Sequence, residues 1–164
     1  ILGLVEADVP AAGKPTSDVA IELIERSIAV KVDVVSRDLR ENGPREILNY
    51  GHTLGHAIER LEDYQLPHGH AISIGMVFAA GLARAAGALD GETLMRHKVL
   101  LAALGLPTTY RPDALPELVE LMRVDKKARG AKLRFVVLDG VGKPMMLEDP
   151  EPALLESAYR EVAV

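Results

Sequence analysis

The chain has 164 residues, of which 48% are hydrophobic and 26% charged, with a formal net charge of -5 and no cysteine. This composition predicts one globular domain with a substantial core, and an acidic chain without a basic run gives little support to nucleic-acid binding. Because cysteine is absent, disulfides and thiolate metal sites are excluded, and any metal must be held by His, Asp or Glu.

The first helix with a clear start is predicted over residues 16–36. Its opening cluster Thr16-Ser17-Asp18 is typical of a helix N-cap, and apolar residues follow at helical spacing. Lys31 falls on this apolar stripe, where it can extend to water or point inward. A second helix is predicted over residues 45–63, because an Asn-Gly-Pro break comes directly before it.

A central helix is predicted over residues 68–89, which are apolar almost all round. The longest stretch without Asp, Glu, Lys or Arg, residues 64–83, contains glycines and polar residues, so it indicates a buried helix rather than a membrane span. Further elements are expected as helices over 90–105, 112–124 and 152–164 and as a β-hairpin over 133–147. The expected fold is mainly α, a helical bundle with one small hairpin, in a single domain over residues 1–164.

Four polar residues are expected to share one face of the helix over 45–63: Arg45, Asn49, His52 and His56. A solvated helix face is the simpler interpretation of such a stripe. However, Asn and His are mediocre helix formers, and Gly51 and Gly55 would each cost about 1 kcal/mol relative to Ala in a helix interior. We therefore expect another backbone or a ligand to approach this face closely.

Four of the five histidines lie within residues 52–70. His52 and His56, four residues apart, could bind a metal, but the metalloprotease pattern needs Glu after the first His, where this chain has Thr53. The connection after the helix is long enough for His68 to return to His52. Two histidines do not complete a catalytic zinc site, which usually has three protein ligands. His97 stands apart and is interpreted as a surface or packing residue.

The segment from Arg45 to Glu59, followed by His68-Gly69 and Gly75-Met76, resembles the 3-dehydroquinate synthase family. The resemblance extends over essentially the whole chain, but only to the C-terminal region of the family. It implies an enzyme of the shikimate pathway, a lyase in aromatic amino-acid and chorismate biosynthesis. With NAD and zinc, or another divalent metal such as cobalt, that enzyme converts 3-deoxy-D-arabino-heptulosonate 7-phosphate to 3-dehydroquinate and phosphate.

The resemblance also implies residue roles. It makes His52 and His68 zinc ligands, and it makes His56 an acid/base residue rather than a ligand. Glu41 corresponds to the other proton-transfer residue. The implied substrate contacts are Lys31, Arg45, Asn49, His52, His68 and one member of the pair Lys126 and Lys127. We expect Lys31, Arg45 and Asn49 to line one cavity with the three histidines.

The family's NAD-binding domain and its third zinc ligand, a Glu, would precede Ile1. The isolated chain is therefore expected to be an inactive fragment. The resemblance also implies a cytoplasmic enzyme that is a homodimer when full length, with no membrane or nucleic-acid partner. Two alternatives remain open: another sugar phosphate cyclase, such as a 2-deoxy-scyllo-inosose or valiolone synthase, or a non-catalytic helical module that binds a partner chain.

Overall fold

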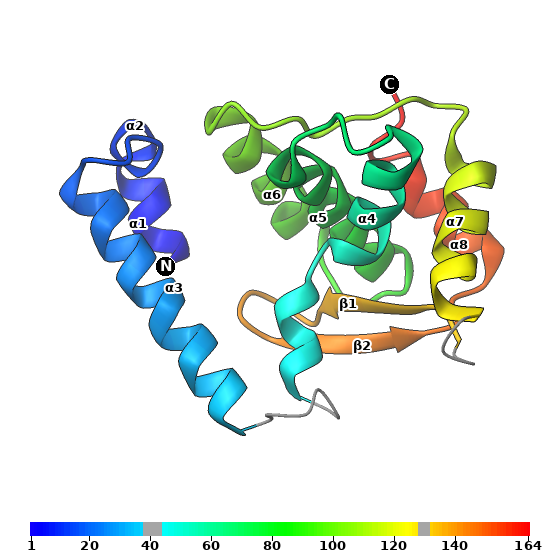
Figure 1. Ribbon diagram of the computed structural model, residues 1–164, viewed down its shortest axis with the longest axis horizontal. Coiled ribbons are helices and arrows are strands. Elements are labelled where there is room, and N and C mark those ends of the chain that lie inside the picture. The colour runs from blue at the N-terminus through cyan, green and yellow to red at the C-terminus, as the bar shows by residue number, and fades with distance from the viewer. Residues whose placement is uncertain (38–43, 128–131) are drawn as a thin grey trace.

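The computed structural model describes residues 1–37, 44–127 and 132–164, with residue 44 and residues 124–127 described for their backbone alone. A main body of helices and one hairpin lies beside three N-terminal helices (Figure 1). The elements in chain order are α1 (Leu2–Ala7), α2 (Val9–Ala12), α3 (Asp18–Arg37), the 3-10 helix η1 (Pro44–Asn49), α4 (His52–Leu61), α5 (His68–Ala85), α6 (Gly91–Ala103), α7 (Leu115–Lys127), β1 (Arg134–Leu138), β2 (Pro144–Glu148) and α8 (Pro152–Tyr159).

The expectation of a mainly helical fold with one hairpin is confirmed. β1 and β2 pair in antiparallel register from Arg134 opposite Glu148 to Leu138 opposite Pro144. Gly140 in the connecting turn has a φ of +92°, a conformation that favours glycine. The two short helices α1 and α2 were not expected from the sequence, because four to six residues are too few to show a helical period.

Helix α5 is the centre of the molecule, as its apolar sequence predicted. It packs against α4, α6, α8 and β1. Val77, Phe78 and Leu82 on it are fully buried, and the Phe78 ring lies 5.9 Å from that of Phe135 on β1. Within the described ranges, none of the helices has the length and apolar character needed to cross a membrane.

The single helix expected over residues 45–63 is wrong, because the chain breaks at Gly51. Gly51 has a φ of +80° and separates η1 from α4. A Cβ on Gly75 would lie 2.0 Å from the Gly51 carbonyl oxygen, and a Cβ on Gly51 would lie 2.7 Å from the Met76 nitrogen. The α5 backbone therefore passes directly against this turn, which confirms the expected close approach. Arg45 and His56 consequently do not share the face of one continuous helix.

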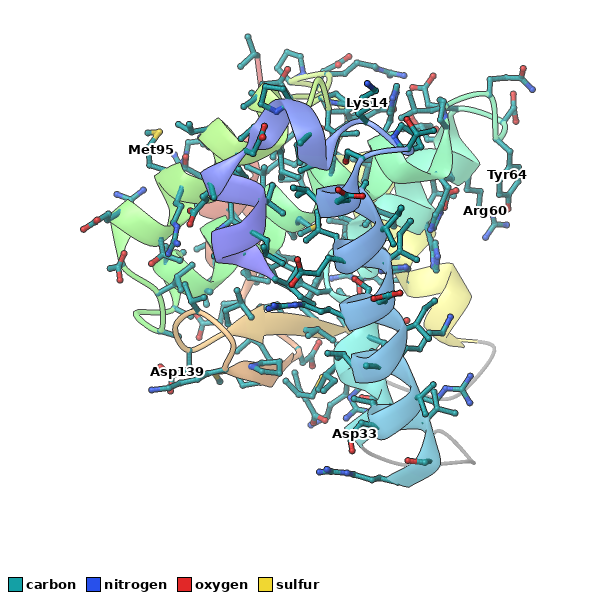
Figure 2. All side chains as sticks on the ribbon, turned by 90° about the vertical axis from the view of Figure 1, so that its left-hand side faces the viewer. Lys14, Asp33, Arg60, Tyr64, Met95 and Asp139 are labelled. Atoms are coloured by element: carbon teal, nitrogen blue, oxygen red, sulfur yellow. The ribbon has the colours of Figure 1, made fainter. Side chains whose placement is uncertain are left out.

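Helix α3 begins as its capping cluster predicts, with the Ala20 nitrogen donating to the Ser17 hydroxyl at 3.0 Å. Of its residues only Ala20 and Val34 are buried. Four apolar side chains on successive turns are between 46% and 61% exposed: Ile21, Ile24, Ile28 and Val32. Figure 2, which faces this side of the molecule, shows α3 in front of the main body with Asp33 near one end.

Candidate metal centre and adjoining pocket

Three histidine rings meet where α4 and α5 begin. The ring centroids lie 5.2 Å apart for His52 and His56, 5.5 Å for His52 and His68, and 6.1 Å for His56 and His68. His52 and His56 stand on consecutive turns of α4, and His68 is the first residue of α5. The expected return of the chain from His52 to His68 is confirmed.

Hydrogen bonds orient two of these rings. Nδ1 of His52 lies 3.1 Å from the Tyr50 carbonyl oxygen, and Nδ1 of His68 lies 2.9 Å from Oε1 of Glu59. A carbonyl and a carboxylate oxygen can only accept, so both Nδ1 atoms act as donors. In the neutral imidazole the lone pair available to a metal is then on Nε2, and such outer partners commonly fix the orientation of metal-binding histidines.

The surroundings of the half-buried His52 ring favour the neutral imidazole, which is the form that binds metals. Burial lowers its pKa from the ordinary value, and the neighbouring His56 and His68 lower it further, against the opposing effect of the Tyr50 carbonyl. Because metal ions bind neutral imidazole, a lowered pKa reduces competition from protons at neutral pH.

The donor set around these rings fits a divalent metal. Within the described residues, His56, Glu59 and His68 offer ligand atoms that all lie within 4.8 Å of one another, and the His52 ring adjoins them. Imidazole nitrogen and carboxylate oxygen are usual ligands of zinc, and imidazole also suits other first-row transition metals. Glu59 was not among the residues singled out in the sequence, although it lies three residues after His56 and therefore on the same side of α4.

A cavity of about 280 Å³ adjoins the cluster. His52 and His56 line it together with the polar residues Glu46, Asn49, Thr53, Arg60 and Arg134, and its far wall includes apolar side chains of α7 and the hairpin. Nη1 of Arg134 donates to Glu46 at 2.8 Å, which connects β1 to η1. The Thr53 hydroxyl donates to the Arg134 carbonyl at 2.9 Å. The hairpin therefore closes one side of the cavity.

The expectation that all six residues line one cavity is wrong for Lys31, Arg45 and His68. Lys31 is exposed on α3, a helix that contacts η1, and it does not line the cavity. Arg45 precedes the break at Gly51 and is not a lining residue either. His68 lies beside the cavity without lining it.

Three of the expected site residues cannot be placed. Glu41 lies outside the described residues, and the side chains of Lys126 and Lys127 do as well. The structure therefore brings together Asn49, the three histidines and several neighbours that the sequence did not mark. Tyr50 is one of these neighbours, since its carbonyl orients His52.

Comparison with known proteins gives one family. The model of the 3-dehydroquinate synthase C-terminal family matches residues 1–128. The 3-dehydroquinate synthase of Saccharopolyspora erythraea is 62% identical over 159 residues, and that of Thermobifida fusca 61% over 163 residues. These matches cover 97% and 99% of this chain but 43% and 44% of the relatives. The chain thus spans less than half the length of the curated relatives it matches.

Two solved structures are similar in fold. A 2-epi-5-epi-valiolone synthase from Streptomyces hygroscopicus, with NAD+ and Zn2+ bound, has a TM-score of 0.83 at 20% identity, covering 96% of this chain and 44% of its own. A 2-deoxy-scyllo-inosose synthase complexed with carbaglucose-6-phosphate, NAD+ and Co2+ has a TM-score of 0.67 at 32% identity, covering 82% and 40%. At its low identity the first similarity concerns the fold alone.

Proposed function

This chain belongs to the 3-dehydroquinate synthase C-terminal family, and we propose that it is the metal- and substrate-binding part of a 3-dehydroquinate synthase. The observation that carries the proposal is the meeting of His52, His56 and His68 beside a cavity that Asn49 also lines. Relatives that are 58–62% identical to this chain over the matched region bear that name. The proposed reaction converts 3-deoxy-D-arabino-heptulosonate 7-phosphate to 3-dehydroquinate and phosphate.

In this proposal His52 and His68 hold a divalent metal through Nε2. Such an ion, when bound, supplies Lewis-acid polarisation of a substrate hydroxyl. His56 lines the cavity next to His52 and is the proposed proton-transfer residue, because an imidazole nitrogen can accept a proton and return it in a later step. Glu41 is the second proposed proton-transfer residue.

The proposed substrate carries a phosphate and a carboxylate, which need cationic partners. Arg45 suits this task because a guanidinium grips an anion with two parallel hydrogen bonds, whereas Lys31 and one of Lys126 and Lys127 would act as point charges. Asn49 in the cavity offers both a donor and an acceptor to the sugar hydroxyls.

We further propose that NAD is bound mainly by residues outside these 164, within a cytoplasmic enzyme that is a homodimer at full length. Gly140-Val141-Gly142 is a glycine-rich segment of the chain, but it connects β1 to β2 and no helix follows it directly. A nucleotide pyrophosphate is usually cradled where a strand turns into a helix. The chain by itself is therefore expected to be inactive.

The test is phosphate release by the full-length enzyme with NAD and Zn2+. Three substrates separate the cyclases: 3-deoxy-D-arabino-heptulosonate 7-phosphate, glucose 6-phosphate and sedoheptulose 7-phosphate. We expect turnover of the first alone, and no turnover by residues 1–164 in isolation. Turnover of glucose 6-phosphate would instead identify a 2-deoxy-scyllo-inosose synthase, the activity of a structural relative at 32% identity. A full-length protein that binds neither Zn2+ nor any of the three substrates would instead be a non-catalytic module.

A further inference from the structure

A half-buried hydrogen-bonded pair joins α6 to the turn before α4. The Tyr50 hydroxyl lies 3.1 Å from Nε2 of His97, and the two rings meet edge to face with centroids 5.9 Å apart. The hydroxyl also lies 3.4 Å from the Met76 carbonyl oxygen. Neither side chain lines the cavity beside the histidine cluster, and neither has a part in the reaction proposed above.

The direction of this hydrogen bond follows from its surroundings. Nδ1 of His97 lies 2.7 Å from the Thr93 carbonyl oxygen, which can only accept, so Nδ1 carries the proton. In the neutral ring Nε2 is then an acceptor, and the Tyr50 hydroxyl must donate to it. Burial raises the pKa of Tyr50, so its hydroxyl keeps the proton that it donates.

The backbone of the same residue reaches the candidate metal centre. The Tyr50 carbonyl accepts from Nδ1 of His52 at 3.1 Å. Between them Gly51, with its positive φ, packs directly against the α5 backbone. The turn over residues 50–52 is therefore held by α6 through the Tyr50 side chain and by α5 through Gly51, and its carbonyl is presented to His52.

We infer that Tyr50 and His97 are positioning residues that hold His52 in the Nδ1-protonated tautomer, with Nε2 free for a metal ion. The pair acts through the Tyr50 carbonyl and does not touch the metal. The metal-binding consequence rests on the proposed function, whereas the tautomer of His52 is a property of the chain itself. Spacing along the chain does not indicate this role, because Tyr50 and His97 are 47 residues apart.

The first measurement is the tautomer of His52, read from 15N chemical shifts of the histidines in the metal-free full-length protein. We expect one Nδ1-protonated form in the wild type and a mixture of tautomers in both Tyr50→Phe and His97→Leu. His97→Gln should restore the single form, because its amide oxygen can accept from the Tyr50 hydroxyl. Tyr64→Phe is the matched control, since Tyr64 is 73% exposed.

The second measurement is Zn2+ affinity, which loss of an outer partner typically lowers by about 10- to 100-fold. We expect a loss of about tenfold in Tyr50→Phe and in His97→Leu, with no further loss in the double variant, because both changes remove the same hydrogen bond. If His52 keeps the single Nδ1-protonated form in both Tyr50→Phe and His97→Leu, the proposal is overturned. A wild-type protein that binds no Zn2+ would instead refute the metal centre, and the tautomers would still decide the positioning role.

Discussion

The crossing of α4 and α5 and the helix α3 are held in place by different kinds of contact. At the crossing, glycines bring two backbones together: a Cβ on Gly55 would lie 2.6 Å from the Ile72 side chain, and one on Gly75 would meet the Gly51 carbonyl. Leu54 and Ile58 are fully buried around it. On α3, in contrast, five apolar side chains at similarly regular helical spacing are about half exposed: Ile21, Ile24, Ile28, Val30 and Val32.

This difference shows which of the described site residues are held in place by packing. His52, His56 and His68 stand on the two helices of the crossing, so their mutual distances follow from a tight backbone contact. Lys31 stands on α3, whose burial against the main body is small. An apolar stripe in a sequence thus predicts a helix but not what covers it, whereas glycines beside functional residues predict a close approach.

The largest effect is expected from Gly75→Ala at the crossing. The added methyl group would overlap the Gly51 carbonyl, a backbone atom that cannot move aside cheaply, and overpacking typically costs about 1–3 kcal/mol and occasionally more. Gly69→Ala on the same helix is the control, because no atom beyond its chain neighbours and its own helix backbone lies within 4 Å of its Cβ position. Urea unfolding should show severe destabilisation in the first variant and little change in the second. Equal stability would mean that the crossing is not as tight as described.

The next effect concerns the two α4 histidines in the full-length enzyme. His56→Ala should lower turnover by about 10²- to 10⁴-fold, the usual contribution of a proton-transfer residue, and leave the zinc content close to one per chain. His52→Ala should lose zinc. Zinc analysis beside steady-state kinetics separates the two outcomes. If His56→Ala loses the metal instead, the ligands are His56, Glu59 and His68, whose donor atoms already lie within 4.8 Å of one another.

Much of the fold could be predicted from the sequence, because long elements carry strong periodic signals. Helix α5 was expected from its apolar surface. Helix α6 was expected over residues 90–105, and it begins at Asp90, whose side chain accepts from the Thr93 nitrogen at 2.6 Å. The break at Gly51 was missed. Glycine is tolerated inside a helical pattern, and the reason for the break is the α5 backbone at Gly75, a contact between residues far apart in the chain.

The site was predictable only in part. The three histidines were marked by their residue type and by the resemblance to a known family, and their rings do meet. Their hydrogen-bond partners, Tyr50 and Glu59, were not marked, because tyrosine and glutamate occur commonly in core and surface positions of helices. Orientation of a ligand depends on such three-dimensional neighbours, which spacing in the sequence does not reveal.

A substitution at Lys31 tests helix α3, the part of the comparison with few buried side chains. Lys31→Met keeps the side-chain stem of an exposed residue, so it should change the free energy of unfolding by less than about 0.5 kcal/mol and leave zinc binding intact. If Lys31 contacts the substrate as proposed, KM in the full-length enzyme should rise about 10- to 100-fold, as for loss of a charged hydrogen bond. Lys14→Met, at an exposed lysine before α3, is the control. An unchanged KM would remove Lys31 from the substrate site.

The smallest effect is expected at the ion pair that connects α1 to α6. Nη2 of Arg96 donates to Oε2 of Glu6 at 2.6 Å, and Nε of Arg96 donates to the other carboxylate oxygen. The hydrogen bond from the Arg96 guanidinium lowers the pKa of Glu6 below its ordinary value of 4.5. Because the folded chain then binds this proton less readily than the unfolded chain, the stabilisation is present above about pH 4.5 and is lost as the pH falls through the lowered pKa.

Glu6→Gln should therefore be slightly less stable than the wild type at about pH 6, and the difference should be smaller at about pH 3, because the stabilisation fades as the pH falls below about 4.5 towards the lowered pKa. The difference should be small and should shrink in salt, because the pair is exposed to solvent. Glu156→Gln, at an exposed carboxylate of α8, should show no such convergence. Unfolding curves at both pH values measure this. A large, pH-independent loss would mean that the α1–α3 segment is attached to the main body more firmly than its exposed contacts indicate.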